Sequence, residues 1–179
     1  MIQLYLTLID EEQDKVRFEA AYYRYRKLMH REANKILKDS HRAEDAVQEA
    51  FLRIARNFHK VGAVEDQQTR NFFVQITRRV AQNMAEREER FSPASADDLA
   101  KSERLAASEH PDVPIHKTEL MQQIRRLPNQ YRDVLYLRGV CGFEMKEIAG
   151  MLEITTDAAW KRFQRARAAL EKEMEKERQ

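Results

Sequence analysis

Glycine and proline are scarce in this chain, and their scarcity constrains the fold more than any other feature. The 179 residues include 4 Gly and 4 Pro, where average usage gives about 12 and about 9. Folds with many tight turns need more of both residue types. The chain also lacks the GxGxxG and GxxxxGK[ST] patterns, which argues against nucleotide-binding enzymes of those kinds. A largely helical chain with few turns is the expectation that remains.

Three of the four prolines, Pro93, Pro111 and Pro114, fall in one stretch and divide the chain. Residues 91–117 also contain four serines and carry three basic and five acidic residues, which is typical of a linker. The flanking segments, 1–90 and 118–179, each carry a net charge of +2. We therefore expect two small basic domains, joined by a flexible acidic linker with room for a short helix near its centre.

Apolar residues recur at helical spacing in both domains. In the first helix they are Phe18, Tyr22, Tyr25, Met29, Ala33 and Ile36. A second helix is predicted from Asp39, as its cap, to Gly62, and a third over 67–90. In the second domain helices are predicted over 119–126, 129–138, 144–151 and 156–177. The predicted fold class is therefore all-α, with two small helical domains.

The last two predicted helices have the layout of a helix-turn-helix. A three-residue turn from Glu153 to Thr155 separates them, and Thr156 is expected to cap the second helix. Ala149 is small where the helices cross, and Ile154 fills the turn. The basic residues at the start of the second helix are Lys161, Arg162, Arg165 and Arg167. Such a helix can enter a DNA major groove and neutralise phosphates, so we expect it to bind DNA rather than only face solvent.

The predicted second helix of the first domain has an outer face around one exposed apolar residue, Leu52. The other residues of this face are Asp45, Gln48, Glu49, Arg53 and Arg56. An apolar anchor ringed by acids and an amide is a candidate protein-docking patch. The pattern by itself also fits an ordinary polar face, so both interpretations stand at this point.

Two segments resemble the bacterial sigma-70 family, in its extracytoplasmic-function (ECF) type. Residues 39–51, DSHRAEDAVQEAF, resemble the region 2 signature. Residues 127–135, LPNQYRDVL, and the helix-turn-helix that follows resemble region 4. Both occur in the family's order, with a short acidic linker between them. The resemblance implies a bacterial, cytoplasmic subunit that directs RNA polymerase to promoters, with no catalysis, cofactor or metal of its own.

The resemblance also assigns three surfaces. The first docks on the clamp helices of the largest polymerase subunit and comprises Asp45, Gln48, Glu49 and Leu52. Region 4 holds the flap of the second-largest subunit, and its residues for the −35 promoter element are Thr156, Asp157, Trp160, Lys161, Arg162 and Arg165. The residues that would capture the unpaired −10 strand are Gln75, Arg78, Arg79, Gln82 and Asn83. Strand capture needs a basic track and stacking surfaces.

The chain departs from the family pattern at several positions. Glu153 stands where the recognition turn usually has Gly, which predicts a non-Gly residue at positive φ. Arg79 and Asn83 replace the usual Asn and Asp of the −10 helix, and residues 86–90 carry net charge −1 where the family is basic. Trp160 replaces a more common polar residue, and either a contact with DNA or packing on its own domain fits the sequence.

Two other functions and one further partner can be compared with the same residues. A free-standing helix-turn-helix regulator with an unrelated first domain also fits, and DNA binding without polymerase would distinguish it. A small helical enzyme fits poorly, because the five His residues are scattered and Cys141 is the only cysteine. The apolar stretch 1–9 lacks the features of a signal peptide, and no run is long enough for a membrane span. An anti-sigma protein is a further partner that the sequence leaves open.

Overall fold

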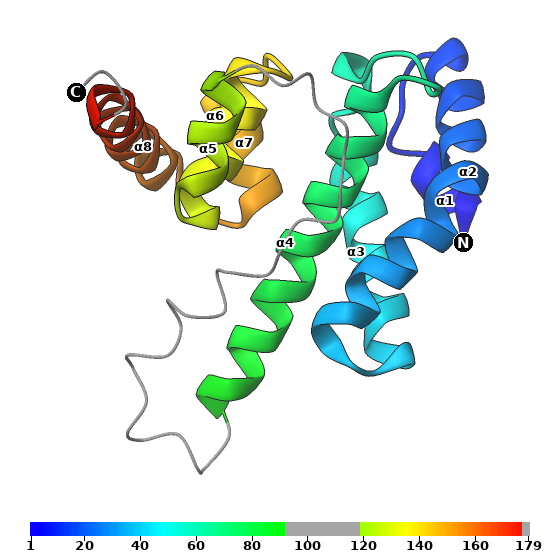
Figure 1. Cartoon of the computed structure of the whole chain (residues 1–179). Helices are drawn as coiled ribbons and strands as arrows, with labels where there is room; N and C mark the ends of the chain where they lie inside the picture. Colours follow the sequence, from blue (N-terminus) through cyan, green and yellow to red (C-terminus); the bar gives the residue numbers. More distant parts are fainter. Residues whose placement is uncertain (92–118, 177–179) are drawn as a thin grey trace. The chain divides into compact units, whose positions relative to one another are not determined.

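The computed structural model describes residues 1–91 and 119–176, and every regular element within these ranges is helical. The chain divides into two compact units, one containing α1 to α4 and the other α5 to α8 (Figure 1). The all-α fold class predicted from the sequence is confirmed for these ranges. The predicted linker lies outside the described residues except for position 91, and so does its short helix.

The first unit is a bundle of three long helices. Its elements are α1 (Ile2–Leu6), α2 (Glu12–Leu37), α3 (Ser40–Ala55), the 3₁₀ helix η1 (Phe58–Lys60) and α4 (Gln67–Phe91). Helices α2, α3 and α4 pack against one another, and α1 contacts α2 and α3 (Figure 1). The predicted apolar stripe of α2 is buried from Phe18 to Ala33, whereas Ile36 is half-buried.

An aromatic cluster fills the core of the first unit. The ring of Phe18 meets that of Phe51 edge-on, with centroids 5.9 Å apart. Helix α1 adds Tyr5, whose ring lies 5.7 Å from Phe51 and 6.0 Å from Tyr22. Burial, followed by the nearby Tyr22 and Glu44, raises the pKa of Tyr5 to about 12. The apolar start of the chain is therefore a short helix that completes this core.

Helix α3 begins where the sequence predicts and ends earlier. The Asp39 carboxylate accepts a hydrogen bond from the Arg42 backbone N–H at 2.9 Å, which confirms the predicted cap. The helix stops at Ala55, so the prediction that it continues to Gly62 is wrong. Phe58 is buried as expected, but it belongs to η1. Phe58 follows the buried Ile54 by four residues, as it would in a continuing α-helix, and the 3₁₀ turn still places its ring in the core.

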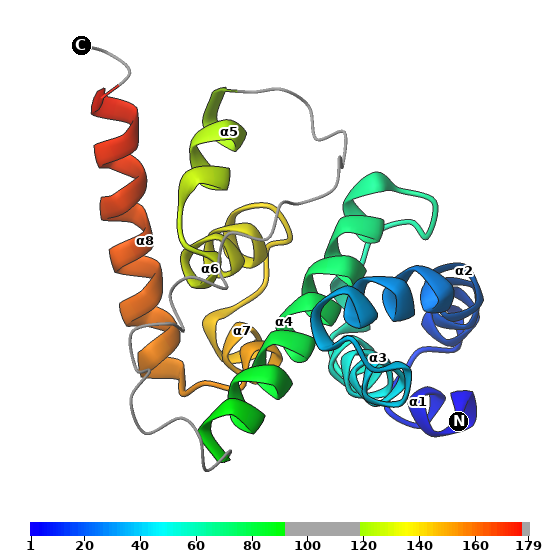
Figure 2. The ribbon, with the colours of Figure 1, turned by 60° about the horizontal axis from the view of Figure 1, so that its bottom comes forward.

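The second unit is built around its last helix. Its elements are α5 (Glu119–Arg126), α6 (Asn129–Gly139), α7 (Met145–Leu152) and α8 (Thr156–Lys176). Helix α8 packs against α5, α6 and α7 (Figure 2). Large apolar side chains of α6 and α7, among them Leu137 and Ile148, are fully buried, as are Ala159 and Ala166 of α8. The small residues let α8 lie close to its neighbours.

Candidate nucleic-acid interface

The turn between α7 and α8 has the geometry of a helix-turn-helix. Glu153 lies in the left-handed region at φ 55° and ψ 47°, which confirms the predicted positive φ. The Ile154 N–H donates to the Ala149 carbonyl at 3.0 Å and closes the turn. The hydroxyl of Thr155, rather than that of Thr156, accepts a hydrogen bond from the Ala158 N–H at 3.2 Å. The predicted cap is therefore wrong by one residue, and the hydroxyl of Thr156 is not needed to start the helix.

The first three turns of α8 present most of the predicted −35 residues to solvent. Those exposed are Thr156, Asp157, Trp160, Lys161 and Arg165. Arg162 is half-buried. The Trp160 ring meets the Phe163 ring edge-on at 6.2 Å and 78°, and 45% of the residue remains exposed. Trp160 therefore leans on its own helix while it keeps a face that a ligand can contact.

The predicted docking face of α3 is less open than the sequence suggests. Asp45 is exposed, whereas Gln48, Glu49 and Leu52 are half-buried. Arg53, which the helical spacing assigns to this face, is only 4% exposed, and its Nε donates to Glu49 Oε1 at 2.8 Å. Arg53 is therefore part of the interior, and the expectation that it lies on the outer face is wrong.

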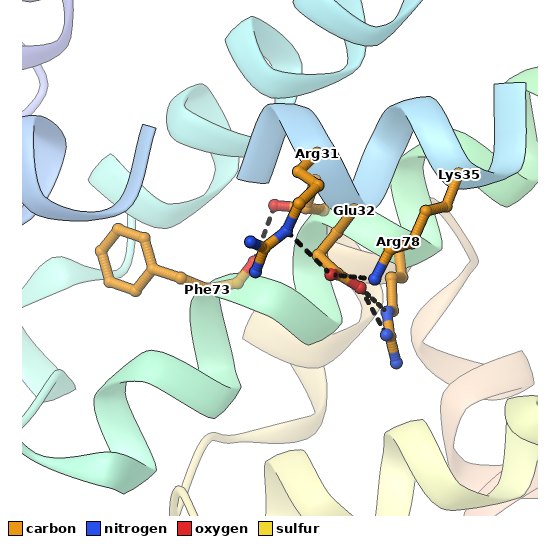
Figure 3. A network of polar contacts seen from close by, with 6 residues as sticks. Arg31, Glu32, Lys35, Phe73 and Arg78 are labelled. Atoms are coloured by element: carbon orange, nitrogen blue, oxygen red, sulfur yellow. Dashed lines mark hydrogen bonds and ion pairs between the residues drawn. The ribbon is translucent and has the colours of Figure 1, made fainter. Parts of the chain in front are cut away.

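The predicted −10 residues Gln75, Arg79, Gln82 and Asn83 lie half-buried on α4, as does Arg78. Arg78 differs from them, because its guanidinium turns toward α2 (Figure 3). Its Nε donates to Glu32 Oε2 at 3.0 Å, and Nη2 donates to the same oxygen. The guanidinium of Arg78 is therefore bonded to Glu32, whereas the sequence predicted that it is open to a ligand.

Glu32 is a buried carboxylate held by several cations. The residue is 3% exposed, and Lys35 Nζ donates to its Oε1 at 2.7 Å while Arg31 Nε lies 3.8 Å from the same oxygen (Figure 3). Burial acts to raise the pKa of Glu32, but hydrogen bonds from Lys35 and Arg78, together with their charges, outweigh it and hold the pKa below its usual value. The carboxylate is therefore ionised at neutral pH, and it neutralises Arg78.

The sequence carries a signal for Glu32 that its apolar pattern obscures. Positions 25, 29, 32 and 36 follow helical spacing, so an acid at 32 falls on the buried side of α2. A buried acid requires a cationic partner. The partner comes from α4, 46 residues later in the chain, and spacing within one helix cannot identify it.

The acidic end of α4 is partly neutralised within the first unit. Glu88 Oε2 lies 2.5 Å from Arg42 Nη1 in the first turn of α3. One of the acids that departs from the family pattern is thus paired with a cation of its own domain. This ion pair ties the last turns of α4 to α3.

Within the described ranges, no cluster of three metal-ligating side chains occurs. None of the described helices combines the length and the apolar character that a membrane span requires.

Two family models match the chain in the order of its two units. The family described as Sigma-70 region 2 matches residues 21–91, and the one described as Sigma-70, region 4 matches residues 117–170. Together they cover more than two thirds of the chain. No curated protein matches it.

The matches decide between the functions that the sequence left open. A region 2 match over α2, α3 and α4 excludes an unrelated first domain, and the region 4 match contains the helix-turn-helix. Sigma factors have core RNA polymerase and promoter DNA as partners, and they serve in promoter recognition rather than catalysis. With region 2 followed by a region 4 of the ECF type, the chain belongs to the sigma-70 family of RNA polymerase sigma factors, in its extracytoplasmic-function group.

Proposed function

We propose that this sigma factor docks on core polymerase through α3 and recognises two promoter elements, −35 through α8 and −10 through α4. Region 4 also holds the polymerase flap. One observation carries the proposal: a basic recognition helix behind a closed turn lies in the same chain as a region 2 bundle. The polymerase catalyses RNA synthesis, and this chain selects the promoter at which synthesis begins.

The −35 element is recognised by the exposed start of α8. Lys161 and Arg165 are exposed cations suited to phosphates. Thr156, Asp157 and Trp160 lie in its first two turns, the part of a recognition helix that reaches base edges. Arg162 is half-buried beside them and completes the basic surface.

The −10 strand is captured by Gln75, Arg79, Gln82 and Asn83 on α4. These side chains offer amide groups for base edges and a guanidinium for stacking or phosphate contact. Arg78 contributes indirectly, because its guanidinium is paired with the Glu32 carboxylate. It fixes α4 against α2 rather than touching DNA.

Binding to core polymerase is the first test. The full chain and core enzyme are mixed at about 1 µM, the range in which a specific interface is saturated, and recovered by pull-down. Run-off transcription from a promoter found by start-site mapping then reports both DNA elements. We expect co-purification and promoter-specific transcripts. A chain that does not bind polymerase at this concentration, or that binds the promoter fully without it, contradicts the proposal.

The docking face is tested most cleanly at Asp45 and Gln48. Glu49 is a poor choice, because it pairs with the buried Arg53 and its replacement would also disturb the interior of the bundle. The double variant Asp45→Ala with Gln48→Ala is expected to weaken core binding at least about tenfold, or 1.4 kcal/mol, with an unchanged circular dichroism spectrum. Gln13→Ala with Glu19→Ala, an amide and an acid exposed on α2, is the matched control. An unfolded Asp45 and Gln48 variant would show that the face assignment is wrong.

A further inference from the structure

A stripe of five cations, four on one face of α2 and the fifth at its C-cap, is left unused by the three proposed surfaces. The residues follow one another in steps of three or four: Arg24, Lys27, Arg31, Lys35 and Lys38. At 100° per residue the first four fall within about 80° of arc. Lys38 follows them as the C-cap, in the left-handed region at φ 55°, and all five are exposed. We call this set the α2 stripe.

The positive charge of the α2 stripe is not balanced by acids on the same helix. Between positions 20 and 38 the sequence has six Lys or Arg residues, and Glu32 is the only acid. Glu32 is buried, and Arg78 of α4 takes up part of its charge. Among the described residues, no acid pairs with Lys27 or Lys38. The stripe therefore presents a net positive surface.

The α2 stripe borders the proposed −10 face. Arg31 and Lys35 contact the same carboxylate that binds Arg78 of α4 (Figure 3). The side chains of Arg31 and Lys35 nevertheless remain 65% and 50% exposed. Glu32 thus joins the middle of the stripe to the helix that carries Arg79, Gln82 and Asn83. A ligand on α4 can therefore reach the cations of α2 where the two helices share this carboxylate.

We infer that the α2 stripe is a sequence-independent track for the phosphate backbone of the strand captured at the −10 element. The inference rests on the proposed function of α4. From Arg24 to Lys38 the stripe spans about 21 Å at 1.5 Å per residue, the length of several nucleotides. Regularly spaced cations match a regularly charged strand. A protein partner would instead favour an apolar centre, and the large exposed apolar residues of α2, Val16 and Tyr23, precede the stripe.

Salt dependence of promoter binding tests the α2 stripe, with the variant Lys27→Gln and Lys38→Gln. Holoenzyme assembled from core polymerase and the full chain binds the mapped promoter, pre-opened across the −10 element, at several salt concentrations. A plot of log K against log salt has a negative slope, and each lost single-strand phosphate contact makes that slope less steep by about 0.7. For the double variant we expect the magnitude of the slope to decrease by about 1.4. We also expect the affinity of the holoenzyme for the promoter to drop several-fold. Core binding and thermal unfolding are expected to match wild type.

The matched control is Lys172→Gln with Lys176→Gln, two exposed lysines at the far end of α8. It removes the same charge and is expected to leave the slope unchanged. An equal change in this control would reduce the result to net charge and overturn the assignment.

Three further outcomes would also overturn it. An unchanged slope for the α2 variant would mean that the stripe is only a solvated face. A loss of core binding at unchanged slope would make it a protein contact. An equal decrease in the magnitude of the slope on fully paired promoter DNA would show that the stripe binds duplex DNA rather than the captured single strand. Failure of the proposed function is recognised separately, because the wild-type chain would then fail to bind core polymerase at all, and the inference would fall with it.

Discussion

At the scale of single residues, Glu32 determines how the cations of the first unit are used. It lies inside the bundle and draws in the guanidinium of Arg78, whereas Arg31 and Lys35 reach it from the surface. The resemblance to the family, together with helical spacing, placed Arg78 among the DNA contacts. Its partner lies on another helix, so periodicity within α4 could not reveal the difference. The same limit applies to Arg53, which the local spacing assigned to the surface of α3.

Replacing Glu32 by Gln is expected to lower the free energy of unfolding of the first unit by about 2 kcal/mol. The figure is below the usual 3–5 kcal/mol for breaking a buried ion pair, because the cations around it keep contact with water. Lys35→Gln removes an exposed partner of the same carboxylate and should cost about 0.5 kcal/mol. Urea denaturation followed by circular dichroism measures both. Equal effects would show that Glu32 is not held mainly by Arg78.

The same carboxylate makes stability depend on pH. Its pKa in the folded chain lies below the ordinary value of 4.5, because the bonds and charges of Lys35 and Arg78 exceed the opposing effect of burial. The stabilisation is therefore complete above about pH 4.5 and is lost as pH falls through the folded-state pKa. We expect the difference in unfolding free energy between wild type and Glu32→Gln to be constant from about pH 7 to about pH 5 and to shrink below that. A difference that grows on acidification would contradict this assignment.

At the scale of helices, the sequence predicts that a helix exists better than it predicts the residues at which the helix begins and ends. The starts of α5, α6 and α8 match the residues predicted for them. Helix α3 ends earlier than predicted. Its end could not be predicted because η1 keeps Phe58 in the core, and an apolar pattern cannot distinguish η1 from a continuing α-helix. The α8 cap was assigned to Thr156 instead of Thr155, since adjacent threonines offer the same chemistry.

The cap provides a matched test at this scale. Thr155→Ala removes the hydroxyl that accepts from the Ala158 N–H and should lower the stability of the second unit by about 1 kcal/mol. Thr156→Ala is expected to change that stability by less than about 0.5 kcal/mol. Thermal unfolding of the full chain measures the two. A larger loss for Thr156→Ala would return the cap to the residue that the sequence first suggested.

At the scale of the whole molecule, the chain consists of two units, each with its own core. The prolines and the charge pattern predicted a chain of two units, and they could do so because linker composition is a local property. Phe51 is fully buried in the first unit and Ile148 in the second. The sequence could not show which residues of one helix meet those of another, because such contacts depend on packing.

Unfolding of the full chain should report the two cores independently. Phe51→Ala is expected to destabilise the first unit by about 3–5 kcal/mol, and Ile148→Ala the second by about 2–5 kcal/mol. In urea titrations followed by circular dichroism, each variant should move one transition and leave the other in place. If either variant shifted both transitions together, the units would unfold as one cooperative body.

Trp160 has a practical consequence. It is the only tryptophan of the chain, it lies on the recognition helix, and it is nearly half exposed against Phe163. In the free chain, indole emission excited at its red edge therefore comes from this one position and needs no label. Stacking of a base or exclusion of water would shift its wavelength and protect it from a soluble quencher. The free chain thus carries an intrinsic fluorescent reporter of the surroundings of α8, which responds to changes in the second unit rather than in the first.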